Sequence, residues 1–174
     1  MYEHAMNQGH IPAATWEVNS NCNIEGVVAK APGGINQTFG NYKWDCPLQT
    51  GGVSLGTAIP SSIRGNLVIT RTGAAADPAV YIEFPNQVEI GGSLLIIGGA
   101  CSVKGTTSTV GLAGDFIMAG GSLKANAPSA ANGIININFK GNSRQSFSKS
   151  GGVIEKSSGT STKGEIKFTI LENA

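Results

Sequence analysis

From residue 53 onward, the chain is a succession of short segments in which apolar and polar residues alternate, interrupted by glycine. One unit recurs: an alternating segment, a glycine, a small or polar residue and then further apolar residues, at residues 63–69, 88–96, 110–118 and 135–142. A period of two is the pattern of a strand with one buried face. No long stretch carries apolar residues at helical spacing, so the pattern predicts an all-β chain.

Glycines mark the length of the repeat. The marker glycines are Gly65, Gly92, Gly114 and Gly141, and Gly-Gly pairs follow at 98–99, 120–121 and 151–152. These spacings predict coils of about 20–30 residues, which must stack to share one core because a single coil cannot bury its apolar face. We therefore predict a right-handed parallel β-helix, or β-solenoid. An antiparallel β-sandwich is the alternative, but the fixed order of strands and glycines disfavours it.

The first 52 residues have a different texture. Residues 1–52 hold both tryptophans and two of the three cysteines, and are expected to form the first coils and an atypical N-terminal cap. Residues 53–174 are expected to continue as the repetitive coils of the same domain. An exposed end of a stack needs capping. At the other end, residues 165–170 alternate charged and apolar residues, which predicts a terminal coil with a polar face.

Five residues of the repeat are predicted to point into the core: Leu67, Leu94, Phe116, Ile137 and Phe139.

Composition supports a folded chain and limits the classes of partner that we expect. The hydrophobic fraction is 40%, too high for a disordered segment, and the 25 glycines suit many tight turns. The net charge of +1 gives no indication of nucleic acid as a partner. No apolar run approaches the ~20 residues that span a bilayer, so membrane insertion is not expected. Met1 is not followed by a signal peptide, so we expect a fragment of a larger protein.

The cysteines suggest a disulfide rather than a metal site. Cys22 and Cys46 lie beside turn residues, and no Cys-x-x-Cys pair is present. We predict a Cys22–Cys46 disulfide, worth roughly 3–4 kcal/mol on the chain-entropy model, with Cys101 as a buried free thiol. Such a bridge would indicate an oxidising, extracellular setting.

Three stretches of the N-terminal part suggest a family. Residues 11–16, 22–26 and 33–47 resemble a block found in large cell-surface proteins of Bacteroidota, where it precedes repeated Gly-Asn-Leu coils. The resemblance extends over nearly the whole chain. It implies a cell-surface location and export by the type IX secretion route, whose sorting domain lies at the far C-terminus of the full proteins. It implies architecture and location rather than an activity.

Catalysis is considered because some β-helices cleave polysaccharides with clustered carboxylates. Here the acidic residues are scattered: Glu83, Glu89 and Asp115 fall at different phases of successive units, where we expect solvated side chains. His4 and His10 alone are too few to predict a metal site. We expect no catalytic residue, metal or cofactor.

The aromatic residues leave a binding role open. Trp16, Tyr42, Trp44 and Tyr81 are candidates for a platform that stacks against sugars, although packing of the tryptophans in the N-terminal core is the favoured interpretation. The predicted function is a non-catalytic, extracellular structural or adhesive module that acts as a rigid spacer and contact surface. Its expected partners are other domains of the parent protein, surface glycans or other cell-surface proteins. The alternatives are a carbohydrate-binding module and, less favoured, a glycan-cleaving lyase or hydrolase.

Overall fold

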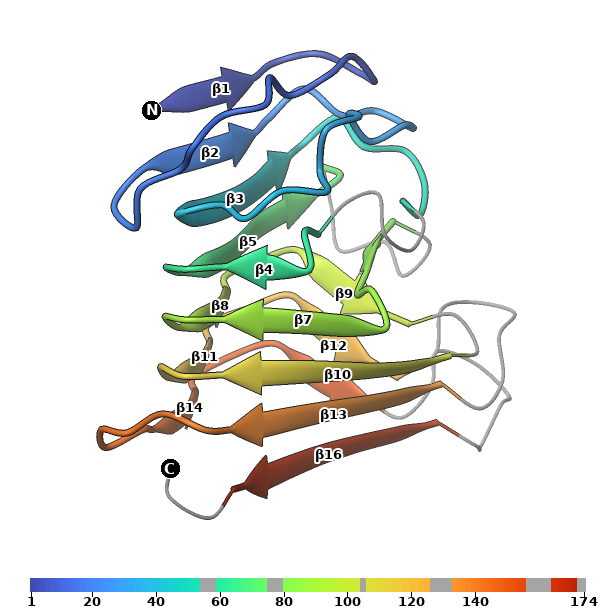
Figure 1. Ribbon diagram of the computed structural model, residues 1–174. Helices are drawn as coiled ribbons and strands as arrows, with labels where there is room; N and C mark the ends of the chain where they lie inside the picture. Colours follow the sequence, from blue (N-terminus) through green and yellow to red (C-terminus); the bar gives the residue numbers. More distant parts are fainter. Residues whose placement is uncertain (54–58, 75–79, 104–105, 126–132, 156–163, 172–174) are drawn as a thin grey trace.

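The computed structural model describes residues 1–53, 59–74, 80–103, 106–125, 133–155 and 164–171 (Figure 1). Within these residues the chain forms strands, turns and bends, and no helix. The prediction of an all-β chain is confirmed. Every strand pairing in the described part is parallel, which excludes the antiparallel sandwich.

The strands form three parallel sheets. The first sheet contains, in spatial order, β1 (Tyr2–His4), β2 (Asn21–Ile24), β3 (Asn41–Cys46), β5 (Leu67–Thr72), β8 (Leu94–Ile96), β11 (Phe116–Met118) and β14 (Phe147–Lys149). The second contains β4 (Ser62–Ile63), β7 (Gln87–Ile90), β10 (Thr107–Leu112), β13 (Ile134–Phe139) and β16 (Glu165–Ile170). The third contains β6 (Ile82–Glu83), β9 (Ala100–Ser102), β12 (Ser122–Lys124) and β15 (Val153–Glu155).

The chain passes through the three sheets in a constant order. From β4 onward it visits the second, first and third sheet in turn, as β4-β5-β6, β7-β8-β9, β10-β11-β12 and β13-β14-β15, before β16 re-enters the second sheet. We call one such passage a coil. Isolated parallel bridges at Phe39 and Val53 extend the same order upstream of β4. Successive coils lie side by side, from the N-terminus at the top of Figure 1 to β16 at the bottom.

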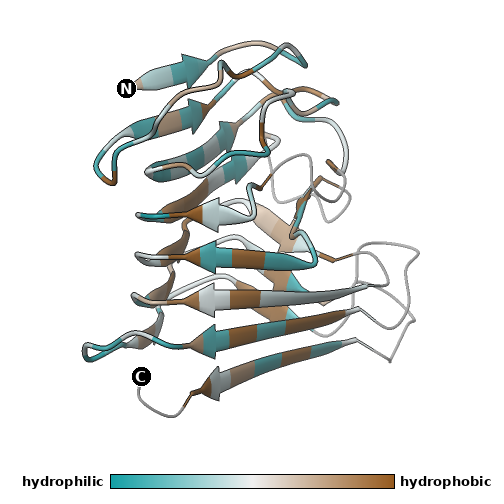
Figure 2. Cartoon of the chain, viewed as in Figure 1, coloured by the Kyte–Doolittle hydropathy of each residue, from teal (hydrophilic) through white to brown (hydrophobic). Residues whose placement is uncertain are grey.

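In-register pairing places buried apolar side chains of successive coils next to one another in the core. Leu94 in β8 pairs with Leu67 on one side and with Phe116 on the other, and all three side chains are buried. Alternation of apolar and polar residues along the strands of the second sheet is visible in Figure 2. The five residues predicted to face the core are all buried, so the phase of the repeat was assigned correctly.

A chain of hydrogen bonds runs along the corner between the second and first sheets. The N–H of Gly65 donates to the carbonyl of Gly40, that of Gly92 to Gly65 and that of Gly114 to Gly92, each at 2.8 Å. Gly65, Gly92 and Gly114 therefore occupy one equivalent position in successive coils. A side chain cannot enter where backbones approach this closely, which explains the requirement for glycine.

The next residue at each corner adds a side-chain bond. The side-chain oxygens of Asn41, Asn66, Ser93 and Asp115 each accept the N–H of the counterpart residue in the following coil, at 2.7–2.9 Å, and Ser146 donates the last of these four bonds. We call these five residues the corner ladder. Its members are 25, 27, 22 and 31 residues apart, close to the predicted coil length.

Aromatic side chains fill the N-terminal end of the core. The ring of Trp16 lies 6.1 Å from that of Tyr2 and 5.0 Å from that of Phe39, and Phe39 contacts Tyr42 at 5.3 Å. Ile11 is also buried here. The N-terminal end of the stack is therefore covered by its own residues.

Candidate functional site

The structure contradicts the predicted disulfide. Cys22 in β2 pairs with Tyr42 in β3, so Cys46 lies four positions farther along the neighbouring strand. At about 3.3 Å per residue this is an offset of about 13 Å, whereas a disulfide needs Cα atoms within about 7 Å. The structure has all three cysteines free and buried, and the Cys46 thiol donates instead to the carbonyl of Ile24 at 3.4 Å. Cys101 is a buried thiol, as predicted.

Burial also makes the two N-terminal thiols unreactive. It raises the pKa of both Cys22 and Cys46 to about 12, because the thiolate would lose its hydration. Because Cys22 and Cys46 form no disulfide, they give no support to an oxidising compartment.

The proposed sugar platform is not formed. Trp16, Tyr42 and Trp44 are buried in the core, and only Tyr81 is partly exposed. The indole N–H of Trp16 donates to Gln37 Oε1 at 2.9 Å, and that of Trp44 to Gln49 Oε1 at 3.0 Å. These polar edges are satisfied inside the protein, so the rings cannot turn outward without breaking bonds.

The three acidic candidates lie in three different settings. Glu83 is on β6 in the third sheet and is buried, so the expectation that it is solvated was wrong. Glu89 is on β7 in the second sheet, where Lys140 donates to it. Partial burial raises its pKa, but the bonds from Lys140 and Gln87 outweigh this and leave the pKa lowered. Asp115 is a corner ladder residue. They do not form a catalytic pair.

The two histidines are also separated by their environments. His4 is buried and bonds to the hydroxyl of Tyr2 at 3.1 Å and the carbonyl of Gln8 at 2.5 Å, while His10 is exposed. Among the described residues, no three His, Cys, Asp or Glu side chains gather where they could hold a metal ion.

A different site lies at the last corner, before β14. Three residues separate β4 from β5, β7 from β8 and β10 from β11, whereas seven, residues 140–146, separate β13 from β14. The amide of Gln145 holds this longer loop in place: its Oε1 accepts the N–H of Gly141 at 2.8 Å, and its Nε2 donates to the carbonyls of Leu112, at 2.9 Å, and Gly114. At the earlier corners, the carbonyl of the marker glycine accepts the N–H of the next marker glycine. At this corner, the carbonyl of Gly114 accepts the Nε2 group of Gln145 instead.

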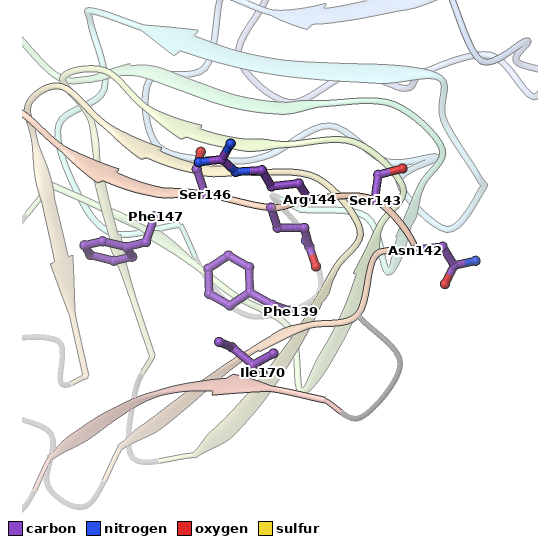
Figure 3. Close-up of a pocket in the computed structure, with 8 residues that line it drawn as sticks. Phe139, Asn142, Ser143, Arg144, Ser146, Phe147 and Ile170 are labelled. Atoms are coloured by element: carbon purple, nitrogen blue, oxygen red, sulfur yellow. The ribbon is translucent and has the colours of Figure 1, made fainter.

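The loop forms one wall of a pocket of about 370 Å³ (Figure 3). The polar lining residues lie on the loop, and the apolar ones lie on β13, β14 and β16; they are Asn142, Ser143, Arg144, Gln145 and Ser146, and Phe139, Phe147 and Ile170. Among the described residues, the lining contains one charged side chain, that of Arg144, and neither a carboxylate nor a histidine. The described lining therefore offers hydrogen-bonding groups and one cationic side chain beside apolar side chains.

The pocket opens onto an apolar C-terminal end. Phe147 is 50% exposed, Phe168 38% and Ile170 79%, whereas their partners in the preceding coil, Phe116, Ile137 and Phe139, are at most 7% exposed. The prediction of a polar-faced terminal coil at residues 165–170 was therefore wrong. The alternation was identified correctly, but no following coil covers its apolar positions within the described part of the chain.

Sequence reasoning missed this site, although a signal was present. The Asn-Ser-Arg-Gln segment at residues 142–145 lengthens one corner of the repeat. Aligning the units on Ser93, Asp115 and Ser146, rather than on the marker glycines alone, would have shown the insertion.

Comparisons with protein-family models, with curated proteins and with solved structures find no match to this chain. The described residues contain no helix of the length and apolar character needed to cross a membrane.

Proposed function

We propose that the chain is a right-handed parallel β-helix that serves as a non-catalytic structural and adhesive module of a larger bacterial cell-surface protein. The observation that carries this proposal is the constant order in which the chain visits three parallel sheets in register. A body of this kind is a spacer: its length grows with the number of coils, and each coil contacts only its neighbours.

Stiffness follows from the bonds between coils. Four successive interfaces, from β3 to β14, combine strand pairing with a bond of the corner ladder, and the core beneath them is continuous from Ile11 to Phe139. Bending the stack would break several of these bonds together.

The outer surface supports a role in contact. On the first sheet, Val68, Leu95 and Ile117 form an in-register outward row of half-buried apolar side chains. Weak contacts along such a face gain strength when a long protein presents several copies. Other domains of the parent protein, surface glycans and other cell-surface proteins are the proposed partners.

The cellular location that we propose is supported by the sequence alone. Residues 11–16, 22–26 and 33–47 resemble Bacteroidota surface proteins. This resemblance supports an extracellular location and export by the type IX route.

The architecture and its stiffness are tested by one distance. Glu3, Asn23, Lys43, Val68, Leu95, Ile117 and Ser148 form one in-register row across the first sheet. Six strand spacings of about 4.8 Å place the Cα atoms of Glu3 and Ser148 about 29 Å apart. Nitroxide labels on Glu3→Cys and Ser148→Cys, both exposed positions, should give a narrow distribution near this value by pulsed electron paramagnetic resonance. The native cysteines are buried and should stay unlabelled. A broad distribution would contradict a stiff spacer.

The absence of catalysis has a separate test. Incubation with acidic and neutral polysaccharides should release no new reducing ends and no unsaturated sugars. Reproducible cleavage that is lost on Glu83→Gln or Glu89→Gln would favour a lyase or hydrolase instead.

A further inference from the structure

We infer that the C-terminal end of the stack is a docking surface for one further coil of the parent protein, which adds a strand to each of the three sheets. This inference rests on the proposed function, in which the chain is part of a longer β-helical protein. The last strands of the three sheets, β14, β15 and β16, all belong to this end. Each therefore has one unpaired edge within the described part of the chain.

The edge of β16 has open backbone groups. The N–H groups of Glu165 and Leu171 donate back to the carbonyls of Gly133 and Phe139 in the preceding coil. Because N–H groups alternate sides along a parallel strand, those of Ile166, Phe168 and Ile170 point to the open side.

The side chains at this end match the interior of the stack. Phe147 stacks on Phe116 with ring centroids 5.0 Å apart, and Phe168 contacts both rings edge-on at 5.0 and 5.4 Å. These rings occupy the inward register of the core, yet their outer faces are exposed. An apolar surface built in this register fits the apolar face of another coil.

The corner ladder also has an unused acceptor at its C-terminal end. Each earlier member accepts the N–H of its counterpart in the next coil, and Ser146, the last member, donates its own N–H to Asp115 Oδ1 at 2.7 Å. Its hydroxyl is exposed at the corner and accepts no such bond from the described residues. A following coil would supply that N–H.

These features favour a parallel coil over a second copy of the chain. Head-to-tail stacking of copies would place this surface against an N-terminal end that is already covered by Ile11 and Trp16. Two C-terminal ends related by a two-fold axis would pair antiparallel, which does not continue the corner ladder.

One position specifies the chemistry of the incoming strand. Lys149 pairs with Met118 and occupies the inward position that Ile96 and Met118 fill in earlier coils. An inward-pointing charge on an edge strand discourages pairing with an arbitrary apolar strand. The docking coil should therefore place an acidic residue opposite Lys149.

The experiment lengthens the full chain by one coil. Ile170 is equivalent to Leu112 through β13, so a copy of residues 113–139, with its Met118 changed to Glu, is joined to Ile170 in place of residues 171–174. Amide hydrogen exchange is then followed by NMR in the unmodified and lengthened chains. The amides of Ile166, Phe168 and Ile170 should exchange at least about tenfold more slowly in the lengthened chain, while those facing β13 change little.

A matched control carries the same added coil with its copied Phe116, Leu123 and Ile137 changed to Ser, and should give no protection. A second control keeps the copied Met118, and should protect less. Equal exchange in the unmodified and lengthened chains, with the body folded, would overturn the inference. So would an unmodified chain that dimerises in sedimentation and already protects these amides, because the occupant is then a second copy. A correct distance between residues 3 and 148 combined with a failed graft would remove only this inference.

Discussion

Truncating Leu94 to alanine tests the central claim that in-register stacking fixes the core. Leu94 is fully buried between Leu67 and Phe116. The substitution removes three carbon atoms, about 2.4 kcal/mol at about 0.8 kcal/mol per buried methylene. The strands on either side cannot close the gap, because backbone bonds from Leu67 to Ser93 at 3.0 Å and from Leu94 to Asp115 at 2.9 Å hold their spacing. A persistent cavity raises the expected loss to about 3–5 kcal/mol.

Leu95 supplies the control, because it lies in the same strand and faces outward between Val68 and Ile117, half-buried. Leu95→Ala should cost about 1 kcal/mol or less. Free energies of unfolding in urea would be measured by circular dichroism and by fluorescence of Trp16 and Trp44, and coincident curves would justify a two-state analysis. Equal losses for the two variants, or a loss under about 1 kcal/mol for Leu94→Ala, would refute the assigned phase.

Three further outcomes are expected. Thiol titration at pH 8 should find no reactive cysteine in the native protein and three after denaturation; one after denaturation would restore the disulfide. A bond from Arg71 lowers the pKa of Asp45, so its stabilising contribution is present above the ordinary carboxyl pKa and is lost as pH falls through the lowered value. The stability gap between wild type and Asp45→Asn should therefore shrink in acid, and a gap independent of pH would contradict this. Gln145→Ala should speed amide exchange at Gly141, whereas Asn142→Ala, on the same loop, should not.

The sequence by itself determined the repeat. Alternation fixed which side chains face inward, and the marker glycines fixed the coil length, because close backbone approach at each corner admits no side chain. Both are local constraints that recur in every coil, so they can be read without knowing the neighbours. The five predicted core residues were correct for this reason.

Tertiary structure decided everything that depends on lateral offset between coils. Cys22 and Cys46 lie on adjacent strands, yet register separates them by four positions, and no local pattern states that register. The burial of Trp16 and Tyr42 likewise depends on how the first coils close over one another.

The two ends of the stack differ for the same physical reason. Both contain apolar alternation, but burial requires a neighbouring coil, and among the described residues covering side chains lie only at the N-terminal end. Residues 165–170 could therefore be identified as a strand from sequence, whereas the exposure of Phe168 and Ile170 could be learned only from what lies, or does not lie, beside them.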